Sequence, residues 1–81
     1  MLSPHQIAAL RKRMNISQAE MAALLGVASR LTVSQWENGF STPGGPIMRF
    51  LSLLDDFSES ELGKIMKRLE KLSHSQSTSK K

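Results

Sequence analysis

The side chains best suited to chemistry lie in one short segment, RLTVSQWEN, at residues 30–38. A helix turns by about 100° per residue, which puts Val33, Trp36 and Glu37 on one side of this segment. The opposite side is small, polar and almost uncharged. Such a surface suits the edges of DNA bases, because glutamine pairs bidentately with adenine, hydroxyls bond to several bases and methyl groups contact thymine. Taken alone, a solvated helix face would explain these polar residues better. The residues on this opposite side are Leu31, Ser34, Gln35 and Asn38, with Thr32 at the margin.

Other chemistry finds little support in the sequence. The absence of cysteine excludes disulfides, thiol nucleophiles and Cys-bound zinc or iron–sulfur clusters. His5 and His74 belong to no recognisable motif, and the acids at 55–61 are typical of helix ends and first turns. Gly44-Gly45 lacks the spacing and the lysine of a phosphate-binding loop, so a linker is predicted. No nucleophile, base and orienting group can be assembled, so no catalytic residue, metal ligand or cofactor is predicted and an enzyme is not expected.

Length and charge narrow the function further. Eighty-one residues make one domain at most, and 40% hydrophobic with 22% charged residues is typical of a soluble globular domain. A net charge of +4 favours a polyanionic partner. The charge is uneven, because residues 1–49 and 64–81 are basic and residues 50–63 are acidic. There is no apolar run of about 18 residues and no signal-peptide pattern, so we expect a cytoplasmic protein without a membrane partner.

Helix signals are dense and strand signals nearly absent. Ser3 and Gln6 form one predicted capping box, with Pro4 at the first helical position, and Ser17 and Glu20 form a second. Gly26 ends the second helix as a left-handed cap. The predicted fold is therefore all-α, a compact domain of four to five helices. The helices expected are one from residue 4 to about residue 14, one over 18–25, one over about 30–38, one from about 47 to 55 and an amphipathic fifth from about 58 to 72.

Two short helices joined by a tight turn are the parts of a helix-turn-helix. Residues 7–54, with the stretches IAALRKRMNISQAEMAALLGV and TVSQWENG followed by Pro43, resemble the Cro/repressor-type (XRE-like) helix-turn-helix family. This resemblance implies a lambda-repressor-like fold and binding to double-stranded DNA. It implies a structural pair between Arg11 and Glu37, and base contacts from the exposed side of the third helix. The base-contacting positions are Leu31, Thr32, Ser34 and Gln35.

Phosphate contacts are expected around the same helix. The resemblance assigns one to Gln18, at the start of the second helix. Arg30 lies at the mouth of the third helix, where phosphate contact and ordinary surface charge are equally good interpretations. The family often carries Lys or Arg after the second glycine, whereas this chain has Phe40-Ser41-Thr42. Hydroxyls and backbone N–H groups would have to replace the missing charge. The predicted phosphate contacts are Gln18, Arg30, Asn38, Ser41 and Thr42.

A second departure concerns the turn. From the turn glycine to the valine of the third helix the family usually counts six residues, whereas Gly26 to Val33 is seven. We place the extra residue in the turn, at Val27-Ala28, because Ser29 then keeps its capping position. If it lay inside the helix instead, Leu31 would turn inward and the predicted base contacts would shift by one.

The fifth helix carries a long apolar stripe and a basic outer face. The four-helix unit needs one or two of the stripe's residues, and a second copy of the chain would cover the rest. A dimer would place two recognition helices about 34 Å apart. The alternative is that the helix folds back over its own domain. The sequence thus divides into a DNA-binding domain at 1–57, a dimerisation helix at 58–72 and a disordered tail at 73–81. The predicted interface is Leu62, Ile65, Met66, Leu69 and Leu72.

Three functions fit this pattern. The first is a sequence-specific DNA-binding regulator, a repressor acting as a homodimer. The second, which the resemblance allows, is an antitoxin that binds a toxin protein and regulates its own operon. In that case the acidic segment at 55–61 or the fifth helix would hold the toxin. The third is a helical interaction module with a degenerate motif. The missing Lys or Arg in the loop after Gly39 is consistent with this third function.

Overall fold

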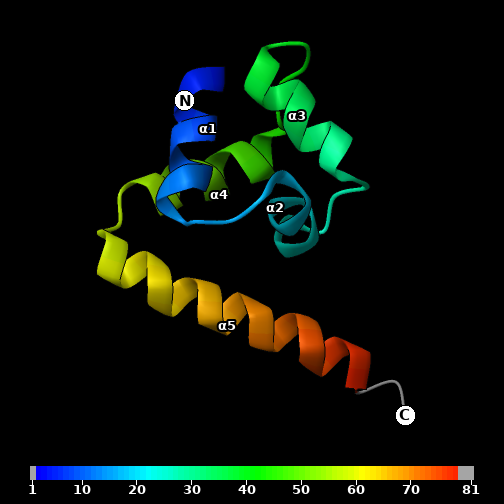
Figure 1. Ribbon diagram of the computed structural model, residues 1–81, viewed down its shortest axis with the longest axis vertical. Coiled ribbons are helices and arrows are strands. Elements are labelled where there is room, and N and C mark those ends of the chain that lie inside the picture. Colours follow the sequence, from blue (N-terminus) through cyan, green and yellow to red (C-terminus); the bar gives the residue numbers. More distant parts are fainter. Residues whose placement is uncertain (1, 79–81) are drawn as a thin grey trace.

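The computed structural model describes the backbone of residues 2–78 and the side chains of residues 2–72 (Figure 1). Within that range the chain folds into helices without a strand, so the predicted all-α class is confirmed. Four short helices form a body, and a longer fifth helix passes across one side of it (Figure 1). The helices are α1 (Pro4–Arg13), α2 (Gln18–Leu25), α3 (Arg30–Asn38), α4 (Gly45–Asp55) and α5 (Glu59–Thr78).

Capping residues set where the helices begin, as the sequence predicts. Ser3 Oγ accepts the Gln6 N–H at 3.2 Å and Gln6 Oε1 accepts the Ser3 N–H at 2.8 Å. Ser17 and Glu20 form the same reciprocal pair at the start of α2, at 3.0 and 2.7 Å. Each box satisfies backbone donors that the first turn of a helix leaves unpaired. The sequence therefore determines these helix starts locally.

The core lies where all five helices meet. Its members are apolar and almost fully enclosed, and α3 contributes Val33 and Trp36 at 0% and 4% exposure. No buried side-chain nitrogen or oxygen among the described residues lacks a hydrogen-bond partner. The core is formed because each of the five helices packs an apolar side against the others. The buried residues are Ile7, Leu10, Met14, Met21, Ala22, Val33, Trp36, Met48, Leu51, Leu54 and Leu62.

Arg13 joins α1 to the connection between α4 and α5. Its guanidinium donates to Asp55 Oδ1 at 3.1 Å and to the backbone carbonyls of Asp55 and Phe57 at 3.3 and 2.6 Å. A cation that bonds the last carbonyls of a helix is favourable, because those carbonyls have no partner inside the helix. Arg13 therefore fixes the direction in which the chain leaves α4. No sequence pattern predicts this contact, because Arg13 and Asp55 are 42 positions apart.

The helix α5 differs from its prediction in two ways. It runs to Thr78 rather than ending near Leu72, because neither glycine nor proline follows Gly63. The predicted disorder at 73–78 is thus replaced by helical backbone, and residues 79–81 lie outside the described range. Its first half folds back over its own domain, where Leu62 is 1% exposed and belongs to the core. Ile65 and Met66 pack partly against that core. Leu62 is therefore an intramolecular contact and is not open to a partner.

None of the helices in residues 2–78 combines the length and the apolar character needed to cross a bilayer.

Candidate nucleic-acid interface

The turn between α2 and α3 is fixed by backbone geometry. Gly26 adopts a left-handed φ of 71°, and the Val27 N–H bonds back to the Ala22 carbonyl at 3.0 Å. Ser29 caps α3 by accepting the Leu31 N–H at 3.2 Å. The extra residue therefore lies in the turn, as predicted, and α3 keeps the register in which Leu31 faces outward. Any other residue at Gly26 would be strained by the positive φ, although the space beside it is open.

The two sides of α3 differ as sharply in the structure as on the helical wheel. Val33 and Trp36 anchor its inner side in the core. On the outer side Leu31 is 60% exposed and Gln35 is exposed, while Thr32 and Ser34 are half-buried. We call these four outer residues the recognition face. Leu31 and Gln35 lie uncovered within the described chain, as a surface that contacts base edges requires, and Thr32 and Ser34 are partly covered.

A partly buried polar network holds α3 against α1 and α2. Arg11 of α1 bonds both carboxylate oxygens of Glu37 on α3, with Nε–Oε2 at 2.5 Å and Nη2–Oε1 at 3.0 Å. Arg11 Nη1 also donates to the Ile16 carbonyl at 2.9 Å, and Gln18 Nε2 of α2 donates to Glu37 Oε1 at 3.1 Å. The side chains of Arg11 and Glu37 keep only 15% and 8% of their accessible surface. The arrangement is the bidentate Arg–carboxylate pairing that fixes geometry as well as charge.

The pKa of Glu37 shows which effect dominates in this network. Burial alone would raise the pKa, but hydrogen bonds from Arg11 and Gln18, with the charges of Arg11 and Lys12, outweigh it and hold the pKa below its ordinary value. The Glu37 hydrogen bond raises the pKa of Arg11 against the opposing effect of burial. Both side chains are therefore charged at neutral pH, and the pair is stabilised as an ion pair.

The predicted phosphate-contacting residues have different surroundings. Arg30, Ser41 and Thr42 are exposed around the two ends of α3. The side-chain amide of Gln18 has two N–H groups. One donates a hydrogen bond to Glu37, and the other can donate to a phosphate oxygen. Asn38 Nδ2 donates to the carbonyl and Oγ of Ser34 at 2.9 and 3.2 Å, so a phosphate would have to displace one of these bonds.

The start of α4 offers backbone donors near the same loop. Gly44 caps this helix without a side-chain hydrogen bond, so the N–H groups of its first turn are not satisfied by a capping side chain. Such groups, with the positive end of the helix dipole, favour an anion.

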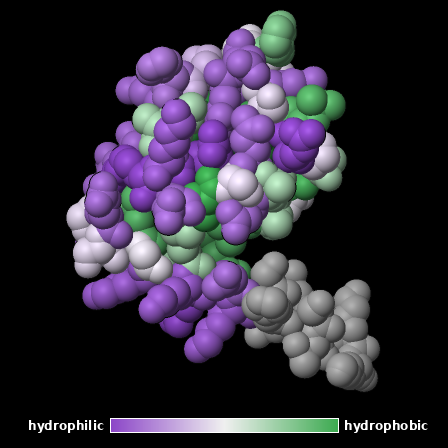
Figure 2. Space-filling view, viewed as in Figure 1, coloured by the Kyte–Doolittle hydropathy of each residue, from purple (hydrophilic) through white to green (hydrophobic). Residues whose placement is uncertain are grey.

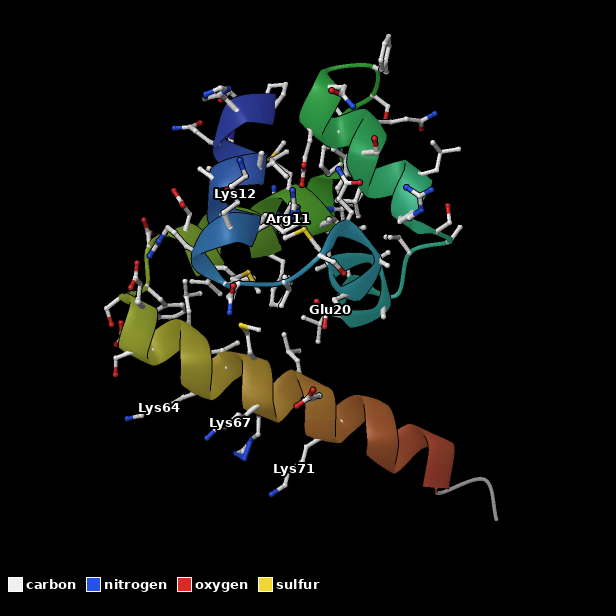
Figure 3. The ribbon with its side chains drawn as sticks, viewed as in Figure 1. Arg11, Lys12, Glu20, Lys64, Lys67 and Lys71 are labelled. Atoms are coloured by element: carbon white, nitrogen blue, oxygen red, sulfur yellow. The ribbon has the colours of Figure 1, made fainter. Side chains whose placement is uncertain are left out.

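The basic side of α5 lies away from this interface. Figure 3 shows Lys64, Lys67 and Lys71 pointing away from the body, on the side of α5 that faces outward. Figure 2 shows mostly hydrophilic side chains over this view of the body, with hydrophobic residues in small groups near α3 and along the seam with α5. A duplex held by α3 would therefore meet the body rather than these lysines. No group of three possible metal ligands lies together in the described residues.

Comparison with known proteins agrees with this geometry. A family model described as helix-turn-helix matches residues 7–62, which is more than half of the chain. The chain belongs to the helix-turn-helix family. The match begins within α1, covers α2 to α4 and ends at the start of α5, and so includes the recognition face and the network that positions it.

One relative extends the comparison. The antitoxin HigA-2 of Vibrio cholerae serotype O1 (strain ATCC 39315 / El Tor Inaba N16961) is 36% identical over 59 residues. The aligned part is 73% of this chain and 56% of that protein, so the chain spans little more than half of the relative's length. No solved structure matches significantly.

The polar network predicts a specific pH dependence of stability. Because the folded-state pKa of Glu37 is lowered, its stabilising contribution is complete above the unfolded-state pKa of about 4.3 and is lost as the pH falls through the folded value. We expect Glu37→Gln to cost about 2 kcal/mol of unfolding free energy at pH 7. That difference from the wild type should shrink below about pH 4.3. Urea unfolding at several pH values measures it, and a difference that stayed constant to pH 3 would contradict an ionised, bonded Glu37.

Proposed function

We propose that this protein is a sequence-specific transcriptional repressor that inserts α3 into the major groove as a homodimer. The observation that carries the proposal is the division of α3. Its back is locked by Val33, Trp36 and Glu37, while Leu31 and Gln35 of the recognition face stay exposed. A rigid helix with small polar side chains on its free side fits the major groove, which admits one helix. Phosphate contacts from Gln18, Arg30 and the hydroxyls of Ser41 and Thr42 would fix its register.

The residues of the recognition face suit different tasks. Gln35 is exposed and can pair with adenine through two hydrogen bonds, and the Thr32 and Ser34 hydroxyls can donate or accept. Leu31, at 60% exposure, suits the thymine methyl group. Repression by steric exclusion needs only that the operator be occupied, so no further surface is required for it. These contacts involve no chemistry on the DNA, which accords with a regulator that is not an enzyme.

A homodimer would supply affinity that one domain lacks. A single domain would contact one half-site, whereas two-fold symmetric half-sites one helical turn apart hold both copies together. The first half of α5 is occupied by its own core, so the dimer must use the second half. There Leu69 is only partly buried and Leu72 is 56% exposed. Apolar residues left uncovered on a helix that extends beyond the body favour a partner helix of the same kind.

Substitution of Gln35 tests the proposed base contact. Gln35 uses its backbone carbonyl to cap α3, at 2.9 Å from the Phe40 nitrogen, so Gln35→Ala keeps the fold. We expect a loss of about 1–3 kcal/mol in binding to an operator in the chain's own upstream DNA and little change in binding to random duplex DNA. Fluorescence-anisotropy titration against each of the two duplexes measures these losses.

Salt dependence is the control for this titration. Wild-type affinity should fall linearly with salt on logarithmic axes, and the slope should be unchanged in Gln35→Ala because glutamine carries no charge. An equal loss of affinity on operator and random DNA would show that Gln35 contacts no base. A wild-type protein that bound no duplex would contradict the proposed function altogether.

The dimer is tested by placing a charge on the second half of α5. We expect Leu69→Glu and Leu72→Glu to sediment as monomers, because two glutamates would face each other in an apolar contact. Leu53→Glu is the matched control, since Leu53 is 52% exposed on α4 and should leave the dimer intact. Sedimentation velocity distinguishes the species, and dimers that persisted in both α5 variants would exclude this interface.

An antitoxin is the second candidate, favoured by the name of the relative at 36% identity. In this role α3 would still bind operator DNA while another surface held a toxin protein. In the acidic segment Asp55 is paired with Arg13, and Glu61 accepts from Ser58 in the cap of α5. The exposed side of α5 is therefore the better toxin-binding surface. Co-purification of the product of the neighbouring gene, with rescue of the growth arrest it causes, would favour the antitoxin over a stand-alone repressor.

A further inference from the structure

The ring of Phe40 is left in solvent by a motif that usually covers such a residue. Gly39 has a φ of 80°, and the N–H groups of Gly39 and Phe40 bond to the carbonyls of Trp36 and Gln35 at 3.3 and 2.9 Å. This pattern is a Schellman motif, in which an apolar residue at the position of Phe40 commonly packs on the side chain at the position of Gln35. Here that side chain is polar, and Phe40 is 82% exposed.

The same bonds fix where Phe40 lies. Its N–H is held by the carbonyl of Gln35, and the Ser41 N–H bonds to that carbonyl as well, at 3.3 Å. Phe40 is therefore attached to the C-terminal end of the recognition face. Leu31 lies at the other end, seven helical positions of about 1.5 Å each before Asn38, the last residue of α3. Two exposed apolar side chains thus border the polar residues of α3.

The surroundings of Phe40 indicate what covers it. Its neighbours in the loop are the exposed hydroxyl residues Ser41 and Thr42, and Gln35 is exposed beside it. The other large exposed hydrophobic residues of α4 and α5, Leu53 and Leu72, lie on different elements. A protein-binding site would need a continuous apolar patch, whereas a single ring among hydroxyl groups matches a duplex surface of methyl groups, sugars and phosphates.

From these observations we infer that Phe40 is a specificity-determining DNA contact whose ring packs against the 5-methyl group of a thymine. It acts at the end of the half-site opposite to that contacted by Leu31. The inference rests on the proposed DNA-binding function and deepens it. Apolar contact with the thymine methyl group is a direct way of identifying that base.

The test removes single methyl groups from the DNA. A preferred site is selected from random duplexes with the wild-type protein, and each thymine is then replaced in turn by deoxyuridine, which lacks only the 5-methyl group. Replacing a thymine contacted by Leu31 should weaken wild-type and Phe40→Ser binding alike. Anisotropy titration should show one further thymine per half-site whose replacement weakens wild-type binding about fourfold. Phe40→Ser should bind the unmodified site more weakly and should not respond to that replacement.

Controls separate this contact from other effects. Phe40→Ser should melt like the wild type because the ring is exposed. Leu53→Ser removes another exposed hydrophobic side chain, at 52% exposure, and should not change the deoxyuridine response. Phe40→Lys should steepen the salt dependence and abolish the preference for thymine. If wild type and Phe40→Ser lose affinity equally at every deoxyuridine, or if Phe40→Ser changes only the sedimentation of the protein, the inference is overturned. If the wild-type protein selects no sequence at all, the proposed function fails with it.

Discussion

Glu37 is bonded by side chains from two other helices, and the orientation of α3 depends on that contact. Arg11 of α1 and Gln18 of α2 meet at one carboxylate, which leaves α3 little freedom to rotate or slide. A partly buried ion pair is costly to desolvate, and it is worth keeping when its geometry specifies one arrangement. Here the arrangement points the polar side of a nine-residue helix into solvent. The core residues Val33 and Trp36 then need only fill the space behind it.

The outer side of the same helix, in contrast, contributes little to the stability of the fold. Leu31 and Phe40 expose apolar surface that folding alone would bury, and the small polar residues between them do little for stability. Isolated exposed hydrophobic residues are common, but two that border one polar face make sense when another molecule covers all of it. Binding would also desolvate the hydrogen-bonding groups of Gln35 and Ser34, so a wrong base would leave them unpaired at a cost. The inner side of α3 thus supplies packing, and the outer side is the one available to another molecule.

The helix α5 divides along its length in a similar manner. Its first turns complete the core through Leu62, and Arg13 fixes their direction through Asp55 and Phe57. Farther along, Leu72 is left exposed while Lys64, Lys67 and Lys71 face away from the body (Figure 3). One helix can thus belong to the fold at one end and offer a surface at the other. The recognition face lies on the body, and a partner held by the second half of α5, whether a second copy or another protein, would leave it uncovered.

The sequence by itself determined the features that are local. Capping boxes at Ser3 and Ser17, the left-handed glycines and the helical spacing predicted the helices α1 to α4 and the two sides of α3, because each depends on residues within a few positions of one another. The Arg11–Glu37 pair was predicted from resemblance. Only the tertiary structure decided that Gln18 joins that pair, that Arg13 holds Asp55, that Leu62 is core and that Phe40 stays uncovered. Those features depend on which distant surfaces meet, and a pattern of neighbouring residues carries no record of that.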